Sequence, residues 1–529
     1  MRTLPYTEYR DLTGGMDDKS DNTEMSPTRF QLIENLYVLN DSLIKRPGYK
    51  NQFSAALSST LIQTMRQYNP TNSVEIGLLS ASGGALFYDD SAVAGTYTLS
   101  PGDGVVVSME DFDDQVVITD GVNPLVYWPN NKDVATGEAA PIVSNSMPTR
   151  AGCIGEFRNR LFMGDLTDVD GKEYPARVMS TEIGRIDTGS PDSNNDLNRS
   201  QKTVAMVRHG GGFLIFQTRS TWIVKYSPDF QNLNPDPFIY NELSSSVGTY
   251  NQNTVITTLE NGTFFVSRRG VYWIPPGEPQ PPIYISSTIE DFWSKVNHNY
   301  LGASSFVEVP EMNGVILNIP YQGSQINNRA IFINYQNIEE LGRNVISPAY
   351  SLFKGEITKE FSFRSGARLV KDGRERTVLG GYDGIVYLFG DVTSDAETGI
   401  AWRFRSPAYG PGGRGREKLW HNFALDVDYD TTYDLTVTIR QYDNSPYTKA
   451  LAGSGGTQSG AYLGPTGRGG SIWTLGSSYL TISAIGTVSG DLKNRSRFIE
   501  LDAAAGASTK AFALHGILLY YKTANNWAL

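Results

Sequence analysis

The sequence predicts an all-β fold, a β-propeller of about six blades followed by a C-terminal β-sandwich-like domain. The first observation is composition, because 29 Tyr, 23 Phe, 53 Gly and 26 Pro in 529 residues favour short strands joined by turns. The second is a hairpin-shaped segment that recurs along the chain. The third is a change of pattern after residue 400, where the strands become longer.

Residues 1–60 are expected to form an N-terminal segment with a short helix and a closing strand. Ser26 has the position of a helix N-cap, and Pro27 would occupy the first helical position. Phe30, Ile33 and Leu36 would then share one face. A second short helix is predicted from Ile289 to about Val296, with Thr288 as its cap and with Phe292 and Trp293 as its apolar anchors.

Residues 61–400 carry the repeated unit, which is a strand, a tight turn and a second strand. Full copies occur at 116–128, 213–226, 264–274 and 377–389, and partial copies at 85–88 and 160–164. The copies are spaced by about 40 to 55 residues over much of this stretch, the length of one four-stranded blade. A lone hairpin cannot bury both faces, so the units must stack, and closure into a ring protects their edges. Stacked β-sandwiches are the alternative arrangement.

Residues 401–529 are expected to form a separate domain. Strands of period two are predicted at 402–405, 423–429, 434–440, 479–485, 496–501 and 512–521. A glycine-rich loop spans 453–470, and its composition indicates an arm that orders only against a neighbouring molecule.

Charge and cysteine content exclude several function classes. The net charge of −11 argues against a protein that grips nucleic acid through a basic face. The one cysteine, Cys153, and the four histidines leave no disulfide framework and no Cys- or His-rich metal site, so no cofactor is predicted. The first residues do not resemble a signal peptide, and no apolar run is long enough for a membrane span. We therefore expect synthesis and folding in a cytoplasm.

No convincing catalytic set emerges from the motifs, so an enzyme is not predicted. The string His209–Gly212 copies an oxyanion-hole motif, but the G-x-S-x-G nucleophile that should accompany it is missing from the chain; a glycine turn is the simpler interpretation. Two Asp-rich stretches, 192–196 and 168–171, have fragments of calcium-loop spacing without the required glycine and glutamate. We interpret both as solvated loops.

Two charged clusters remain as candidates. Glu110, Asp111, Asp113 and Asp114 form an acidic turn, which a glycosidase could use only if two carboxylates met at a defined separation. Within the glycine-rich stretch 410–418, Arg414, Arg416 and Lys418 are candidate contacts to a neighbouring subunit or to a DNA backbone. This stretch lacks the Gly-Lys-Ser/Thr ending of a phosphate-binding loop.

Several segments together resemble the propeller-type tail proteins of short-tailed bacteriophages, the tail nozzle or packaged-DNA stabilisation proteins. The opening is similar in its glycine pair, its Tyr37–Leu39 strand and its Lys45–Tyr49 turn. The resemblance continues through blade-like segments and covers most of residues 10–390. These segments are 156–164 with 177–180, 212–216 with 222–224, and 267–273.

The resemblance implies a virion structural protein that forms a ring, commonly of six copies, below the portal and adaptor. Such a ring extends the DNA channel, helps retain the genome and offers surfaces to fibres or spikes. Its subunits contact double-stranded DNA without reading its sequence and do not insert into a membrane. Two other functions remain open: a carbohydrate-active, tailspike-like propeller using Asp111, Asp113, Asp120 or Asp383, and a generic protein-binding propeller adaptor.

Overall fold

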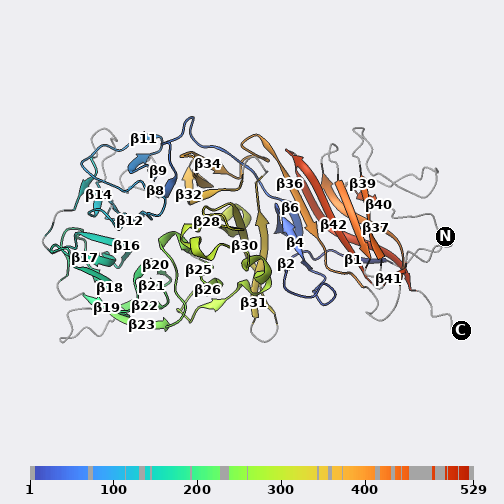
Figure 1. The fold of residues 1–529 in the computed structure, drawn as a ribbon, viewed down its shortest axis with the longest axis horizontal. Coiled ribbons are helices and arrows are strands. Elements are labelled where there is room, and N and C mark those ends of the chain that lie inside the picture. The colour runs from blue at the N-terminus through green and yellow to red at the C-terminus, as the bar shows by residue number, and fades with distance from the viewer. Residues whose placement is uncertain are drawn as a thin grey trace.

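The fold consists almost entirely of antiparallel sheets, gathered into two lobes (Figure 1). The computed structural model describes residues 6–68, 76–113, 115–129, 138–142, 144, 146–190, 194–226, 238–258, 260–341, 345–355, 360–371, 373–410, 418–429, 435–441, 444–451, 479–482, 495–496, 498–509 and 511–523.

Five consecutive segments each form a separate four-stranded antiparallel sheet. Their strands are β8 (Ile62–Tyr68), β9 (Gly77–Ser82), β10 (Ala85–Tyr88) and β11 (Ser91–Ala92); β12 (Ser108–Phe112), β13 (Gln115–Thr119), β14 (Val126–Trp128) and β15 (Ala140–Pro141); β16 (Arg150–Phe157), β17 (Arg160–Thr167), β18 (Glu173–Ser180) and β19 (Asn195–Asp196); β20 (Thr203–His209), β21 (Gly212–Gln217), β22 (Thr221–Tyr226) and β23 (Phe238–Ser244); and β24 (Val255–Thr258), β25 (Gly262–Ser267), β26 (Gly270–Ile274) and β27 (Ile283–Tyr284).

Two further four-stranded units belong to a larger sheet. One contains β28 (Ser305–Val309), β29 (Gly314–Ile319), β30 (Arg329–Leu341) and β31 (Val345–Phe353), and the other contains β32 (Phe363–Lys371), β33 (Arg374–Gly381), β34 (Val386–Phe389) and β7 (Tyr49–Asn51). The first strand of each unit contacts the first strand of the next, and β32 returns to contact β8. The units therefore close around a common centre, as propeller blades do (Figure 1).

The described chain thus contains seven such units where the sequence predicts about six. The unit missed by sequence analysis is β28–β31, which occupies the long interval between the hairpins at 264–274 and 377–389. Its second and third strands are joined by residues 320–328 and not by a tight turn. The strand–tight turn–strand pattern that marks the other units is therefore absent from this stretch of the sequence.

Apolar side chains fill the spaces between neighbouring units. The middle strands β9 and β21 are buried along their whole length, on both faces. Between the third and fourth units, for example, the rings of Phe162 and Phe213 lie 5.0 Å apart, centroid to centroid. Burial on both faces explains why these strands are nearly continuous apolar runs in the sequence.

The second lobe is built from two layers of strands. One layer contains β4 (Leu32–Glu34), β36 (Thr398–Arg405), β42 (Ile499–Ser508), β38 (Leu435–Gln441) and β39 (Asn444–Leu451), and the other contains β1 (Tyr6–Tyr9), β5 (Leu36–Leu39), β6 (Ser42–Lys45), β43 (Phe512–Thr523), β37 (Lys418–Tyr429), β40 (Tyr479–Ile482) and β41 (Arg495–Ser496). Trp402 and Phe512 stack across the layers with centroids 4.0 Å apart. Because β4 and β5 are successive in the chain, the layers approach a closed, barrel-like sheet on that side. The glycine-rich loop at 453–470 lies outside the described residues.

Helical structure is limited to single turns in the described part of the chain: η1 (Gln252–Thr254), η2 (Ser286–Ile289), α1 (Glu290–Trp293), η3 (His298–Ala303) and η4 (Pro310–Met312). The helix predicted from Ile289 to about Val296 is confirmed only in part: it is shortened to α1, with Phe292 and Trp293 buried as expected. The predicted cap is wrong, because Thr288 lies within η2 and Ile289 occupies the N-cap position without a side-chain hydrogen bond. Over the described residues, no helix has the length and apolarity needed to cross a membrane.

The helix predicted to start at Ser26 is wrong. This segment forms β3 (Arg29–Phe30), which pairs with β2 (Gly15–Met16), and then β4 and β5. Glu34 pairs with Leu352 on one side and with Arg403 on the other, so tertiary strand pairing overrides the local helix-start signal. Phe30, Ile33 and Leu36 are fully buried, as their apolar spacing suggested, but on strands.

The first 60 residues are distributed over both lobes. β1, β5 and β6 join the second lobe, β4 joins β31 to β36, and β7 is the outer strand of the last propeller unit. β35 (Ser394–Asp395) pairs with both β7 and β36. One sheet therefore runs from the ring of blades into the second lobe through N-terminal strands.

Candidate functional site

The basic residues predicted to contact a partner are only marginally described. Arg414 and Arg416 lie outside the described residues. Lys418 is the first residue of β37, where its backbone pairs with Ser496 and Thr523; its side chain is not described. Their contact with a neighbouring subunit or with DNA therefore stays a prediction.

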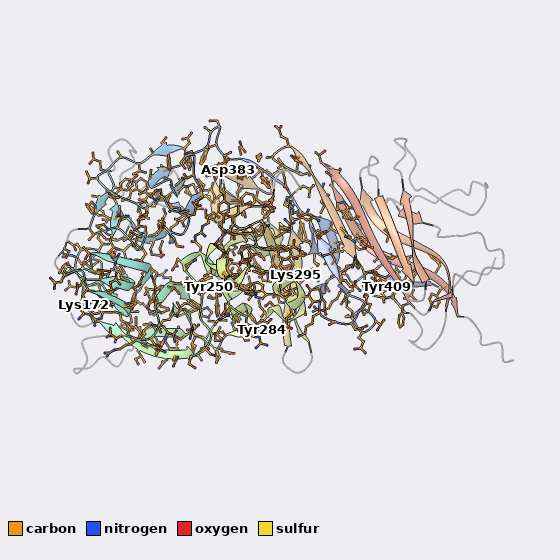
Figure 2. The ribbon with its side chains drawn as sticks, in the orientation of Figure 1. Lys172, Tyr250, Tyr284, Lys295, Asp383 and Tyr409 are labelled. Atoms are coloured by element: carbon orange, nitrogen blue, oxygen red, sulfur yellow. The ribbon has the colours of Figure 1, made fainter. Side chains whose placement is uncertain are left out.

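The carboxylates considered for a glycosidase have separate local roles. Asp111 accepts a hydrogen bond from Arg66 at 3.0 Å, and Asp383, on the turn between β33 and β34 (Figure 2), accepts one from the Tyr387 hydroxyl. Asp113 lies on the turn that joins β12 to β13, whereas Asp120 follows the opposite end of β13. The structure does not bring the four carboxylates together.

Asp120 is held ionised by its neighbours. Burial opposes its charge, but hydrogen bonds from Asn123 and from the backbone N–H groups of Val122 and Ser100 outweigh burial and lower its pKa. A general acid needs a raised pKa, so Asp120 is suited to holding its turn and not to donating a proton.

The Asp-rich stretches also make local contacts. Asp168 accepts hydrogen bonds from the backbone N–H groups of Asp170 and Lys172. Asp196 pairs with Arg177 at 2.7 Å and with Arg199 at 3.3 Å, while Asp192 lies outside the described residues. Over the described ranges, no group of three or more His, Cys, Asp or Glu side chains is placed to hold a metal ion.

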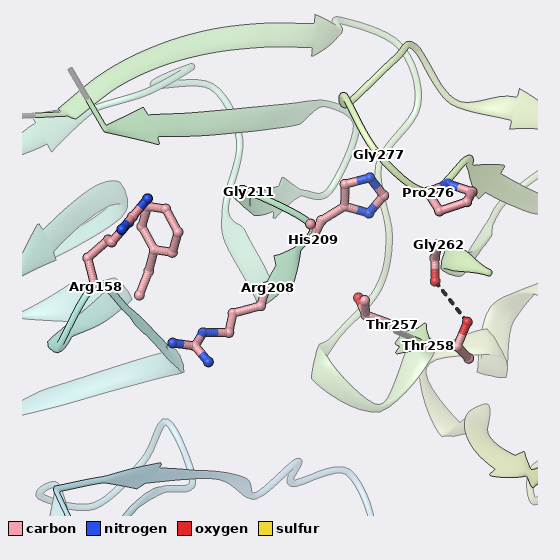
Figure 3. A pocket seen from close by; sticks show the side chains of 11 residues that line it. Arg158, Arg208, His209, Gly211, Thr257, Thr258, Gly262, Pro276 and Gly277 are labelled. Atoms are coloured by element: carbon pink, nitrogen blue, oxygen red, sulfur yellow. Dashed lines mark hydrogen bonds between the residues drawn. The ribbon is translucent and has the colours of Figure 1, made fainter. Parts of the chain in front are cut away.

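The His209–Gly212 string forms the turn between β20 and β21, with Gly210 at a φ of 52°. It borders a cavity of about 390 Å³ that also contacts the turns of the third and fifth propeller units (Figure 3). The imidazole of His209 is 1% exposed and lies 2.7 Å from the hydroxyl of Thr263. Burial lowers the pKa of His209, so this ring is neutral at pH 7 and links two units.

Two arginines border the same cavity. Arg208 pairs with Glu156 at 2.6 Å, and Arg158 lies over the rings of Phe157 and Tyr226. Figure 3 shows both side chains on the far side of the cavity from Pro276. This site therefore presents the guanidinium of Arg158 beside a glycine turn, while the charge of Arg208 is paired with Glu156.

A larger cavity of about 590 Å³ lies where the propeller units meet. Six of the seven units contribute to its wall, through residues of their first strands or of nearby loops, and none of the described lining residues comes from β8–β11. Representative lining residues, one from most units, are Asp103, Asp120, Gly152, Lys202, Tyr250, Tyr300 and Arg364. We call it the axial cavity.

A buried ion pair joins the two lobes. The side chains of Arg46 and Asp395 are 0% and 2% exposed, and their atoms Nη1 and Oδ1 are 2.8 Å apart. Arg46 also donates to the Asn35 side chain and to the carbonyl oxygens of Pro47 and Lys354. All five N–H donors of the guanidinium are thereby used.

The same contacts reach the second lobe. Asn35 donates from its side-chain amide to the carbonyl oxygen of Ala401 on β36 and accepts from the backbone N–H of Lys354 beyond β31. Arg46 also lies over the ring of Phe361, with 4.9 Å between its guanidinium carbon and the ring centroid. We call Asn35, Arg46, Lys354, Asp395 and Ala401 the junction network.

Sequence analysis missed most of these residues. Arg46 was noticed only as part of the Lys45–Tyr49 turn, and its partner Asp395 is 349 positions away. Arg364 ends an alternating apolar stretch, Phe361–Arg364. A cation beside strand residues does not indicate which group it contacts. Neither position carries a motif from which a partner could be read.

Comparisons with known proteins show no family for this chain. No protein-family model and no curated protein sequence matches this chain. Among solved structures, the chain is similar to one described as "YCF48 bound to D1 peptide", with a TM-score of 0.36, at 11% identity, over 66% of this chain and 99% of that one.

Proposed function

We propose that this chain is a structural subunit of a phage tail, a nozzle or hub ring below the portal and adaptor. It extends the DNA channel, helps retain packaged DNA and docks fibres or spikes, and its place is the virion after synthesis in the host cytoplasm. The proposal starts from the resemblance of residues 10–390 and does not involve catalysis.

The observation that best supports the proposal is the rigid connection between the two lobes. A tail ring must keep its shape against the pressure of packaged DNA, so hinge motion between its lobes would be harmful. Here one sheet runs through both lobes, and the junction network buries an ion pair with every guanidinium donor used. Domains of one chain usually move relative to one another unless the interface between them is large and hydrophobic. A sheet that continues from one lobe into the other removes this freedom.

Size and charge indicate where DNA passes. The axial cavity of about 590 Å³ is too small for a double helix, whose major groove alone is about 12 Å wide. In this proposal DNA therefore runs through the middle of a ring of subunits and not through the blades of one subunit. The net charge of −11 repels the DNA backbone, so that DNA can slide.

The test is native mass spectrometry of the purified full chain over a range of concentrations, alone and with the adaptor and portal proteins of the same phage. We expect one closed oligomer, most simply a hexamer, that binds the adaptor. Cryo-electron microscopy of this oligomer should show a central opening wide enough for a double helix. A chain that stays monomeric under all of these conditions would contradict the proposal.

A further inference from the structure

Two arginines of this protein are buried to the same extent but differ in their contacts. Arg46 and Arg364 are each 1% exposed. Every N–H donor of Arg46 has a partner, whereas Arg364 makes one hydrogen bond, from Nη1 to the carbonyl oxygen of Ala303 at 3.0 Å. Its Nε has no hydrogen-bond partner, and no ion pair to it is found within the described residues. Burying a cation without an ion-pair partner is costly, and the negative charge of Asp103 offsets only part of the effect of burial, which still lowers the pKa of Arg364.

The position of Arg364 suggests what balances this cost. Arg364 lies on β32, the first strand of the last propeller unit, and borders the axial cavity. Nη1 donates to Ala303, and no hydrogen bond from Nε or Nη2 is found within the described residues. This pair of parallel N–H donors matches the two oxygens of a carboxylate.

The exposed part of the cavity wall combines apolar side chains with polar ones, among them Asn299 and Gln325. Seven large apolar side chains are exposed in the described part of the chain, and Val122, Tyr300 and Ile326 are three of them. All three border the axial cavity. Exposed apolar side chains gathered around a concave site that also carries polar groups are typical of a ligand site.

The other charges of the wall favour a ligand with one negative charge. The carboxylate of Asp120 accepts hydrogen bonds from backbone N–H groups of its own turn and of Ser100. Lys202 pairs with Asp165 at 2.6 Å. Asp103 is exposed and adds a negative charge at the same cavity. A polyanion would be repelled by Asp103, whereas a single carboxylate can reach Arg364 with an apolar group against Tyr300 and Ile326.

We propose that the axial cavity binds a single carboxylate carried on an apolar group, with Arg364 as the residue that anchors the carboxylate. The carboxylate belongs either to a small organic acid or to the free C-terminus of an apolar peptide, which share this chemistry. Binding here is independent of the ring assembly proposed above, because the cavity is formed within one chain.

The first test uses the unaltered full-length protein. N-acetyl-phenylalanine and N-acetyl-phenylalaninamide have the same apolar group and differ in the carboxylate. Isothermal titration calorimetry should show binding of the acid that is about tenfold or more tighter than binding of the amide, the difference expected for a charge-assisted hydrogen bond. Equal affinities, or no binding of either compound, would overturn the proposal.

Variants of Arg364 then test whether the preference for the acid arises in the axial cavity. Arg364→Met should remove the preference for the acid, and Arg364→Lys, which keeps the charge without the paired donors, should retain only part of it. Arg374→Met is the matched control, because Arg374 is exposed on the neighbouring strand of the same unit and its loss changes the net charge equally. A preference that persists in Arg364→Met, or is lost in Arg374→Met, refutes the assignment.

A last comparison separates the two sources. Apolar peptides that end in a free carboxylate or in an amide are titrated beside the small acid. Tighter binding of the free-acid peptide than of the small acid assigns the cavity to a chain terminus, and the reverse order assigns it to a small organic acid. Failure of both acids would leave the tail-ring proposal unaffected, because that proposal is tested by oligomeric state.

Discussion

At the scale of single residues, Arg46 has the largest structural role that the described contacts reveal. Replacing it by Met removes the guanidinium and leaves the buried carboxylate of Asp395 without a counter-charge. Breaking a buried pair in this way costs about 3–5 kcal/mol, so Arg46→Met should unfold at a clearly lower urea concentration than the unaltered protein.

The control for this prediction is an ion pair at the surface. Arg185 and Asp187 lie 3.1 Å apart, and both side chains are more than half exposed. Arg185→Met should therefore lower the urea midpoint far less than Arg46→Met does. If Arg46→Met and Arg185→Met have the same urea midpoint, the junction network does not contribute to the free energy of unfolding in the way described.

Asp18 predicts a dependence of stability on pH. Its carboxylate accepts hydrogen bonds from the backbone N–H groups of Asp291 and Phe292 at the start of α1. Burial nevertheless raises its pKa from 3.8 to about 6. Because the folded pKa is the higher one, the stability that Asp18 contributes is fully present below about pH 4 and is lost as pH rises through about 6.

Asp18→Asn removes this titration. The variant should gain melting temperature relative to the unaltered protein at pH 7.5, and the gain should shrink or reverse at pH 4.5. Comparing the two proteins at each pH by differential scanning fluorimetry cancels the contributions of other titrating groups. A difference in melting temperature that does not change between these pH values would show that Asp18 does not titrate in this range.

The contacts of single residues are also the feature that the sequence predicts least well. The chemistry of Arg46 and Arg364 depends on which distant groups surround them, and Asp395 and Ala303 are far away in the chain. Local patterns encode strand and turn preferences but not the partner of a buried charge. The acidic cluster illustrates the same point, because Asp111 pairs with Arg66 from the preceding unit.

At the scale of elements, most hairpins could be predicted because their signal is local. The strands at 116–119 and 126–128, and those at 264–267 and 271–274, are present as β13–β14 and β25–β26. Their alternation and tight turns are sufficient to specify a hairpin. The failed helix at Ser26 and the missed unit β28–β31 are the cases in which pairing with distant strands, or a long connection, replaced that local signal.

The turn before β7 offers a test at this scale. A Cβ at Gly48 would lie 2.0 Å from the carbonyl oxygen of Ser394, and the backbone of Gly48 bonds to Val392 and Gly390. Gly48→Ala should therefore displace β7 from the last propeller unit and cost about 1–3 kcal/mol or more. The urea midpoint measures this loss.

Gly506→Ala is the matched control, because an added Cβ at Gly506 on β42 meets nothing within 4 Å. This variant should be close to neutral. A Gly48→Ala protein that is as stable as Gly506→Ala would mean that β7 tolerates displacement and does not hold the last unit closed.

At the scale of the whole molecule, the arrangement depends on the first 60 residues. The ring of seven units is completed by β7, and the second lobe is joined to it by β4 and the junction network. Sequence analysis assigned these residues to one N-terminal segment with a closing strand. Their division between two lobes could not be foreseen, because it results from pairings with β31, β34 and β36.

The N-terminal strands fasten both lobes into one body. Hydrogen–deuterium exchange with mass spectrometry tests it directly, by following the peptides that contain β4 and β7 beside those that contain their partners β31, β34 and β36. We expect the amides of β4 and β7 to exchange as slowly as those of their partners, because they open only when the sheet opens. Rapid exchange of β4 and β7 while β34 and β36 stay protected would contradict the claim.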